Sequence, residues 1–355
     1  MRILTKLGRF LTLAFLGGSG LLPAPAAFAA DPPPSYSYGT PVFGLAVAPD
    51  GSLLVADYGS GIVELRKGKG ALVAALPTVT DVAPIGRGDM FAVTGKDPAG
   101  QAPTAQKLYR VSRGNTRQIA DLLAFETAVN PAGGDIDSNP FDVALLTGGK
   151  VLVADAGGND LLIIDAKGNV DWVAILPDQL APTDNIKNLA GCPTPVPGFE
   201  WVCGLPDAMP AQAVATSIAI GPDGAYYVGE LKGFPAPTGM SRVWRVEPGT
   251  LHADCSTSPA CTVVADGFTS IIDLAFSPGG TLYVVEFDEA SWAAVEFGLG
   301  GVGGTVNGCD ASTWACTEVA AGLPLPSAAA VGGDGTLYAA IWALVPGMAQ
   351  VIALP

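Results

Sequence analysis

A six-fold repeat constrains this chain more than any other feature of its sequence. In each copy, a short apolar run leads into a turn, usually Gly-containing, and a second apolar run ends in an acidic, polar or apolar residue. Gly suits such tight turns because it adopts positive φ without strain. The first runs occupy 44–48, 81–83, 142–146, 217–220, 273–276 and 328–331, and the second runs end at Asp57, Thr94, Asp155, Glu230, Glu286 and Ile341.

The runs are apolar on both faces, which is expected where strands lie between two neighbouring sheets. Further strand-like runs follow each copy, as at 62–65 and 72–76. Four antiparallel strands per repeat form one blade of a β-propeller. The sequence therefore predicts an all-β fold, a single six-bladed propeller of four-stranded antiparallel blades over residues 31–355.

The sixth copy ends with its third strand at 350–354. Residues 36–42 precede the first copy and are predicted to supply the missing fourth strand. Such closure by an N-terminal strand would join the two ends of the propeller and remove a bare sheet edge.

The first thirty residues have the layout of a secretory signal peptide. Arg2, Lys6 and Arg9 precede an apolar stretch at 10–22, and Ala27-Phe28-Ala29 is a small-x-small cleavage signal. An uncleaved membrane anchor is the alternative. No other stretch is long enough to cross a bilayer, so we expect the mature chain to be exported, either secreted or periplasmic, with no membrane span.

Charge narrows the range of partners. The chain has a net charge of −15, only 14% charged residues and 49% hydrophobic residues. So much apolar surface must be buried, which indicates a globular domain, and we expect it to be a monomer. The acidity argues against nucleic acid and anionic lipid as partners.

Six cysteines in an exported chain indicate disulfides, and their spacing favours neighbouring partners. No Cys-x-x-Cys occurs and His252 is the only histidine, which weighs against zinc and excludes a Ser-His-Asp triad. A proline-rich insertion at 177–213 is expected to be a surface excursion with little regular structure. The predicted pairs are Cys192–Cys203, Cys255–Cys261 and Cys309–Cys316.

Carboxylates recur where strands of each blade meet the channel mouth. The start of the first strand and the end of the second lie on the same face, so these acids are expected to gather there and recruit a cation such as Ca²⁺. The alternative is that each acid accepts N–H groups of a nearby turn. The residues concerned are Asp57, Asp81, Asp142, Asp155, Glu230, Asp273 and Glu286.

The densest polar stretch leads into the third copy. Oxygen-bearing side chains alternate at Asp135, Asp137 and Asn139, and Asn159 and Asp160 are expected to face them. This resembles an oxygen-rich calcium loop, although the EF-hand frame is absent. A loop that bonds its own backbone is the alternative.

Several long motifs resemble the ScyD/ScyE family. They are GDIDSNP at 134–140, VADAGGNDLL at 153–162, TSIAIGPDGAYYVGELKGFP at 216–235 and GFTSIIDLAF at 267–276. The family is named from the gene cluster for scytonemin, an extracellular pigment. The resemblance covers most of the mature chain and implies an exported propeller related in repeat style to NHL proteins, with no settled reaction. The cysteine-bearing turns and the long insertion depart from the family pattern.

Two classes of function fit these features. The first is a non-catalytic propeller that binds a small molecule or a protein at the channel mouth, as an accessory factor in extracellular or periplasmic metabolism. The alternative is a calcium-dependent hydrolase similar to the gluconolactonase or strictosidine-synthase-like propellers. Those enzymes hold a cation with Glu, Asn and Asp, and the matching set here is Asn139, Asp155, Glu230 and Asp273.

Overall fold

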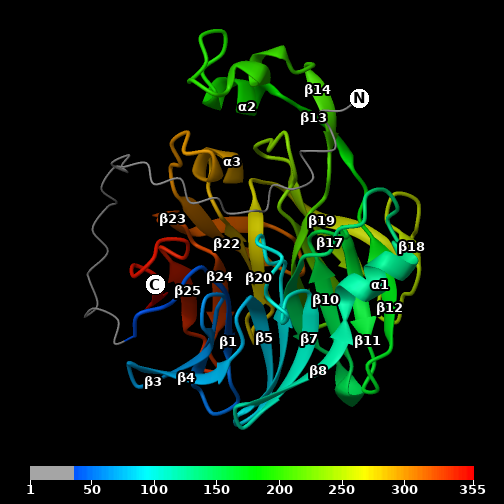
Figure 1. Cartoon of the computed structure of the whole chain (residues 1–355), viewed down its shortest axis with the longest axis vertical. Coiled ribbons are helices and arrows are strands. Elements are labelled where there is room, and N and C mark those ends of the chain that lie inside the picture. The colour runs from blue at the N-terminus through cyan, green and yellow to red at the C-terminus, as the bar shows by residue number, and fades with distance from the viewer. Residues whose placement is uncertain (1–35) are drawn as a thin grey trace.

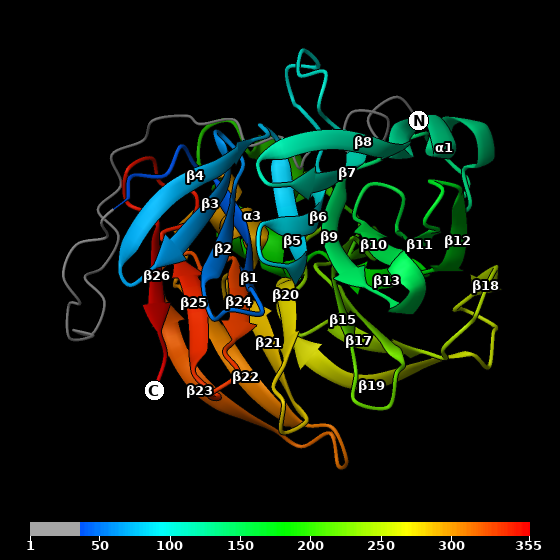
Figure 2. The ribbon, with the colours of Figure 1, turned by 90° about the horizontal axis from the view of Figure 1, so that it is seen from below.

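The computed structural model describes residues 36–355, so the predicted signal peptide at 1–30 lies outside the described residues. Six antiparallel sheets stand around a common axis, each with its first strand innermost (Figure 2). We call these sheets blades 1 to 6. The prediction of a six-bladed, all-β propeller is confirmed.

The first three blades follow one another along the chain, and each strand pairs with the next. Their strands are β1 (Val42–Val47), β2 (Leu53–Asp57), β3 (Gly61–Arg66) and β4 (Lys69–Ala75); β5 (Val79–Gly86), β6 (Asp89–Thr94), β7 (Lys107–Ser112) and β8 (Asn115–Asp121); and β9 (Pro140–Leu145), β10 (Val151–Asp155), β11 (Asp160–Ile164) and β12 (Val170–Ile175).

The last three blades continue the pattern, and a short strand, β18 (Ala253–Asp254), reaches from blade 4 to pair parallel with β12. Their strands are β15 (Ala215–Ile220), β16 (Tyr226–Glu230), β17 (Ser241–Val246) and β19 (Cys261–Phe268); β20 (Ile271–Phe276), β21 (Thr281–Glu286), β22 (Gly304–Asp310) and β23 (Cys316–Leu323); and β24 (Ala328–Val331), β25 (Leu337–Ile341) and β26 (Gln350–Ala353).

The core lies between the blades. Side chains on both faces of a strand are buried, as with Val55 and Ala56 in β2, because each sheet packs against two neighbours. Ala56, for example, shares one hydrophobic cluster with Val82 and Met90 of blade 2. The doubly apolar runs in the sequence have this cause.

A β-bulge interrupts the start of the innermost strand in each of the first five blades. One residue on the inner strand has no partner on the second strand at this point. A bulge re-aims the side chain of its extra residue. The extra residues are Phe43, Thr80, Phe141, Thr216 and Ile272.

The predicted closure by an N-terminal strand is not found in residues 36–355. Blade 6 has three strands there, and Val42 begins the innermost strand of blade 1 instead. Blades 6 and 1 meet through Val42, whose N–H donates to Ala343 O at 2.9 Å and whose carbonyl accepts from Ser327 Oγ at 2.7 Å. Apolar packing of Tyr38 and Leu45 against Ala328 completes this junction.

The insertion at 177–213 is more regular than the sequence predicted. It contains a two-stranded hairpin, β13 (Gln179–Pro182) with β14 (Ala208–Ala211), and between them α2 (Asp184–Leu189) and the 3-10 helix η3 (Glu200–Gly204). The segment is proline-rich and nevertheless ordered, and a disulfide joins Cys192 to Cys203 within it. Figure 1 shows it projecting beyond the blades, above α3 (Trp292–Glu296).

All three predicted disulfides are present, which fits an extracellular or periplasmic protein. The remaining helices are short, α1 (Leu122–Val129) and the 3-10 turn η2 (Thr147–Gly149). Within residues 36–355, no helix has the length and apolar character that crossing a membrane requires.

Candidate functional site

The channel mouth has two regions, one covered by the insertion and α3 and one that holds a pocket. Over blades 4 to 6, Ile186 and Val202 of the insertion and Trp292 of α3 pack in one buried cluster with Leu231 and Ile272. We call this region the covered half. The Asn185 amide fastens α2 there, donating to Ala236 O at 2.7 Å and Ser291 Oγ at 3.1 Å.

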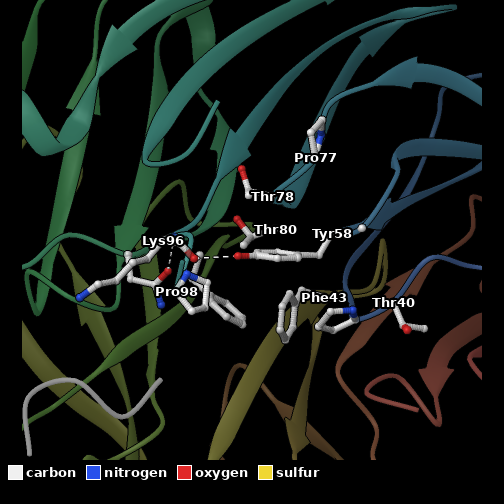
Figure 3. Close-up of a pocket in the computed structure, with 12 residues that line it drawn as sticks. Thr40, Phe43, Tyr58, Pro77, Thr78, Thr80, Lys96 and Pro98 are labelled. Atoms are coloured by element: carbon white, nitrogen blue, oxygen red, sulfur yellow. Dashed lines mark hydrogen bonds between the residues drawn. The ribbon is translucent and has the colours of Figure 1, made fainter. Parts of the chain in front are cut away.

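Over blades 1 to 3 the mouth holds a pocket of about 390 Å³, and we call this region the open half (Figure 3). Its volume lies within the range of about 300–1,000 Å³ that is usual for small-molecule sites. The lining residues are Thr40, Pro41, Phe43, Tyr58, Gly59, Pro77, Thr78, Thr80, Lys96, Pro98, Asn139 and Phe141.

Bulge residues contribute the apolar walls of the pocket. The Phe43 and Phe141 rings lie 5.1 Å apart, and Phe43 meets Tyr58 edge-on at 5.8 Å between centroids. Figure 3 shows Tyr58 reaching toward Lys96 with Phe43 beside its ring. The third bulge residue, Thr80, uses its hydroxyl to donate to Pro140 O at 3.0 Å, so it ties blade 2 to blade 3.

The polar groups of the pocket bond one another. The Tyr58 hydroxyl donates to Lys96 O at 2.8 Å, and burial together with the Asp97 charge raises the Tyr58 pKa to about 12. The Lys96 N–H donates to Asn139 Oδ1 at 2.8 Å, and its ammonium pairs with Asp137. Tyr58 is therefore neutral at physiological pH, and the Lys96 charge is compensated.

Three of the predicted site residues, Asp81, Asp142 and Asp273, lie at matching places on inner strands. Each carboxylate accepts an N–H group of the next blade around the ring. Asp142 binds Ile218 at 2.6 Å, Asp273 binds Ala329 at 2.6 Å, and Asp81 binds Val143 at 3.2 Å.

Burial raises the pKa of all three carboxyls, and mutual repulsion adds to the effect for Asp81 and Asp273. Asp81 and Asp142 also hydrogen-bond to each other through their side chains. Two carboxyls in such contact share a proton more readily than they both ionise. The predicted gathering of acids across the axis therefore applies to this inner set.

The acids that end second strands act locally. Asp57 accepts the Gly39 N–H at 2.6 Å, Asp155 the Asn139 N–H at 2.6 Å, and Glu286 the Thr269 N–H. Each of these amides lies just before the innermost strand of the same blade. The carboxylates thus fix the segments that lead into the blades, as in the turn-forming alternative.

Glu230 ends the second strand of blade 4 and sits among cations. Its carboxylate accepts two bonds from Arg242 at 3.0 Å each and one from Trp244 Nε1 at 2.6 Å. The ammonium of Lys232, fully buried, lies 2.7 Å from Glu230 Oε2, although this contact is not aligned as a hydrogen bond. Burial lowers the Lys232 pKa, and the Glu230 charge opposes that shift.

The remaining predicted site residues, Asp135, Asn159 and Asp160, differ in burial and in hydrogen bonding. Asp135 is exposed, whereas Asn159 Oδ1 accepts the Val214 N–H at 2.7 Å and holds the segment that leads into blade 4. Asp160 is fully buried and neither carboxylate oxygen has a hydrogen bond; burial, then repulsion from Asp155 and Glu126, raises its pKa.

The predicted calcium site would need several carboxylate oxygens gathered around one point. Within residues 36–355, no three His, Cys, Asp or Glu side chains are grouped so that they could hold a metal ion. Most of the candidate carboxylates instead point their oxygens at N–H groups. As arranged, they do not fit a calcium site.

Sequence reasoning identified Asn139 and missed the other pocket residues. The signal was present one position before the aligned residues Gly44, Asp81 and Asp142, where Phe43, Thr80 and Phe141 stand. That position is the bulge, and it lies just before the first runs at 44–48, 81–83 and 142–146, so the repeat pattern did not include it.

Comparisons with known proteins identify the fold. No family profile matches the sequence, and no curated protein matches it. Among solved structures, a gluconolactonase from Xanthomonas campestris is 12% identical, with 95% of this chain and 99% of that one covered and a TM-score of 0.57.

Two further structures illustrate the range. The calcium-binding protein regucalcin from Agrobacterium tumefaciens is 13% identical, covering 90% of this chain and 92% of its own, with a TM-score of 0.55. A virginiamycin B lyase from Staphylococcus aureus is 13% identical, covering 89% and 85%, with a TM-score of 0.50. At such identities the likeness concerns the six-bladed propeller fold alone.

Proposed function

We propose that this chain is a small-molecule-binding propeller that acts outside the cytoplasm, with its ligand site in the open-half pocket. The observation that carries the proposal is the pocket itself, a concave aromatic site at the channel mouth. Mostly apolar walls with a few polar groups are typical of ligand sites. The ordered acids around it serve to fix the blades.

A calcium-dependent lactonase remains the second candidate. The likeness to a gluconolactonase over nearly the whole of both chains favours it at the level of the fold. It would require the carboxylates that now bind backbone N–H groups to release them for a cation. Calcium would then raise the melting temperature, since a ligand that binds only the folded state stabilises it.

Binding of neutral ring compounds, followed by calorimetry and by thermal shift, tests the proposal. Pro98 is exposed and lines the pocket, so Pro98→Trp should fill it and weaken binding at least about tenfold. Pro49, exposed in the turn after β1, offers the matched control Pro49→Trp.

Turnover separates the two candidates. The same protein is assayed for lactone hydrolysis with calcium and with a chelator. Binding that Pro98→Trp abolishes, without hydrolysis, supports the proposed function. Calcium-dependent hydrolysis would support the lactonase, and failure of every compound to bind would refute the binding proposal.

A further inference from the structure

We infer that the ligand of the open-half pocket is an uncharged, planar aromatic molecule that presents a hydrogen-bond acceptor to the Asn139 amide. This inference rests on the proposed function, because it specifies the ligand of the same pocket. It follows from the groups that line the pocket and from the hydrogen bonds that those groups have already made.

The walls of the pocket favour a ligand that is flat and apolar. The Phe43 ring contacts Tyr58 edge-on and Phe141 at a tilt, and all three residues line the pocket. Aromatic pairs in such geometry gain energy beyond the burial of their area. The rim prolines Pro77 and Pro98 are stiff and add no charge.

Most polar groups in the pocket have no donor left for a ligand. The Tyr58 proton is directed to Lys96 O and the Thr80 proton to Pro140 O. The Lys96 ammonium pairs with Asp137, so a ligand charge of either sign would meet a compensated ion pair. An uncharged ligand therefore fits best.

Asn139 and Thr40 are the exceptions. The Thr40 hydroxyl lines the pocket and is buried without a hydrogen-bond partner, but it can rotate, whereas the Asn139 amide has a fixed orientation. The Asn139 side chain is more than nine-tenths buried, at 8% exposed, and lines the pocket. A backbone N–H can only donate, so the bond from Lys96 fixes the amide oxygen toward Lys96 and turns the NH₂ group the other way. Within residues 36–355, Nδ2 of this amide makes no hydrogen bond to the protein and keeps some surface accessible from the pocket.

A ligand that covers this donor must supply an acceptor for it, because a donor that is buried without a partner costs free energy. A carbonyl oxygen on an aromatic ring supplies such an acceptor without adding charge. The pocket thus offers ring faces for the body of the ligand and one oriented N–H donor for its oxygen.

Matched probes test the inference on the full mature chain. They are 2-acetylnaphthalene, its hydrocarbon counterpart 2-ethylnaphthalene and the saturated ketone 2-acetyldecalin. In the wild type, calorimetry should show the aromatic ketone binding about tenfold more tightly than the hydrocarbon and about fivefold more tightly than the saturated ketone.

Asn139→Asp keeps an oxygen for the Lys96 N–H and removes the NH₂ donor, so it should abolish the preference for the aromatic ketone over the hydrocarbon. Asn159→Asp is the matched control, because Asn159 also accepts a backbone N–H but lies outside the pocket lining. It should leave the preference intact.

The inference fails if wild-type protein binds the hydrocarbon as tightly as the ketone, or if Asn139→Asp keeps the tenfold preference. In either case the proposed function stands, since binding still occurs. If no probe and no other neutral ring compound binds, the proposed function itself fails. Should Asn139→Asp not fold, the three probes on the wild type decide alone.

Discussion

The two halves of the channel mouth are built from the same repeat, but side chains at the same repeat position can be buried in one half and exposed to the pocket in the other. In the covered half the bulge residue Ile272 is 6% exposed beneath Trp292 and the insertion. In the open half the bulge residue Phe43 is only half-buried and faces the pocket. The repeat therefore sets where side chains enter the mouth but not how exposed they become, since Phe141 of the open half is as buried as Ile272 and Phe43 is not.

Truncating one aromatic side chain in each half should give the largest contrast. Trp292 is buried and its Nε1 donates to Lys232 O at 2.7 Å, so Trp292→Ala should lower the free energy of unfolding by about 3–5 kcal/mol. Phe43→Ala should cost less, about 1–2 kcal/mol, and should weaken ligand binding. Urea denaturation of both variants measures the difference, and equal losses would contradict the division of the mouth.

Removing the Cys192–Cys203 disulfide should loosen only the covered half. The double change Cys192→Ser with Cys203→Ser should destabilise the chain by up to about 3 kcal/mol, because the unfolded insertion gains freedom. Binding in the open-half pocket should stay within about twofold of wild type. Calorimetric titration checks this, and a large loss of affinity would show that the insertion shapes the pocket.

The free energy of unfolding should fall as the pH rises, because buried acids in both halves lose protons that the folded state binds more tightly. Burial raises the Glu286 pKa to about 7, above its usual value near 4.5. Because the folded state holds this proton more tightly, the stabilisation is complete below the usual pKa and is lost as the pH rises through 7.

Glu286→Gln should flatten this decline by about 1–3 kcal/mol between pH 4.5 and 7.5. Asp81→Asn should act in the same direction in the open half, because its amide imitates the protonated acid beside Asp142. Melting curves across this pH range report both effects. Glu318→Gln, at an exposed position of β23, is the control, and an unchanged slope in Glu286→Gln would refute the assignment.

The smallest contrast concerns two hydroxyls that link blades. Thr80 Oγ1 donates to Pro140 O in the open half, and Thr216 Oγ1 donates to Ile271 O at 2.7 Å in the covered half. Thr80→Val and Thr216→Val should each cost about 1–2 kcal/mol of stability. Only Thr80→Val should alter the affinity for pocket ligands, and a change in both variants would mean that the halves are coupled.

The sequence predicted the fold well because a propeller is a repeated local pattern. Turn residues and apolar runs such as 44–48 mark strands wherever they occur, and close cysteine spacing restricts the disulfides. The candidate site was predicted less well. Asn139 was found among polar neighbours, but Phe43 and Phe141 were missed, because each stands one residue before a predicted run and hydrophobicity alone does not identify a bulge.

The expected role of the acids shows a second limit. A carboxylate at the end of a strand has the same sequence signature whether it binds a cation or a backbone N–H. Only the position of the preceding segment, as with Gly39 against Asp57, distinguishes them. Contacts between residues far apart in the chain are what the repeat pattern cannot supply.

The junction between blades 6 and 1 has a consequence for how such a ring can change over time. In residues 36–355 the strands of each blade follow one another along the chain, apart from the short β18, which joins the edge of blade 3 from the segment of blade 4. The junction between blades 6 and 1 depends on contacts such as Ser327 Oγ to Val42 O, with no strand exchanged between the two ends. Duplication or deletion of one repeat would then add or remove a whole blade without splitting a sheet. Moving the chain ends to another junction would also leave the sheets undivided, except between blades 3 and 4, where β18 bridges the two blades.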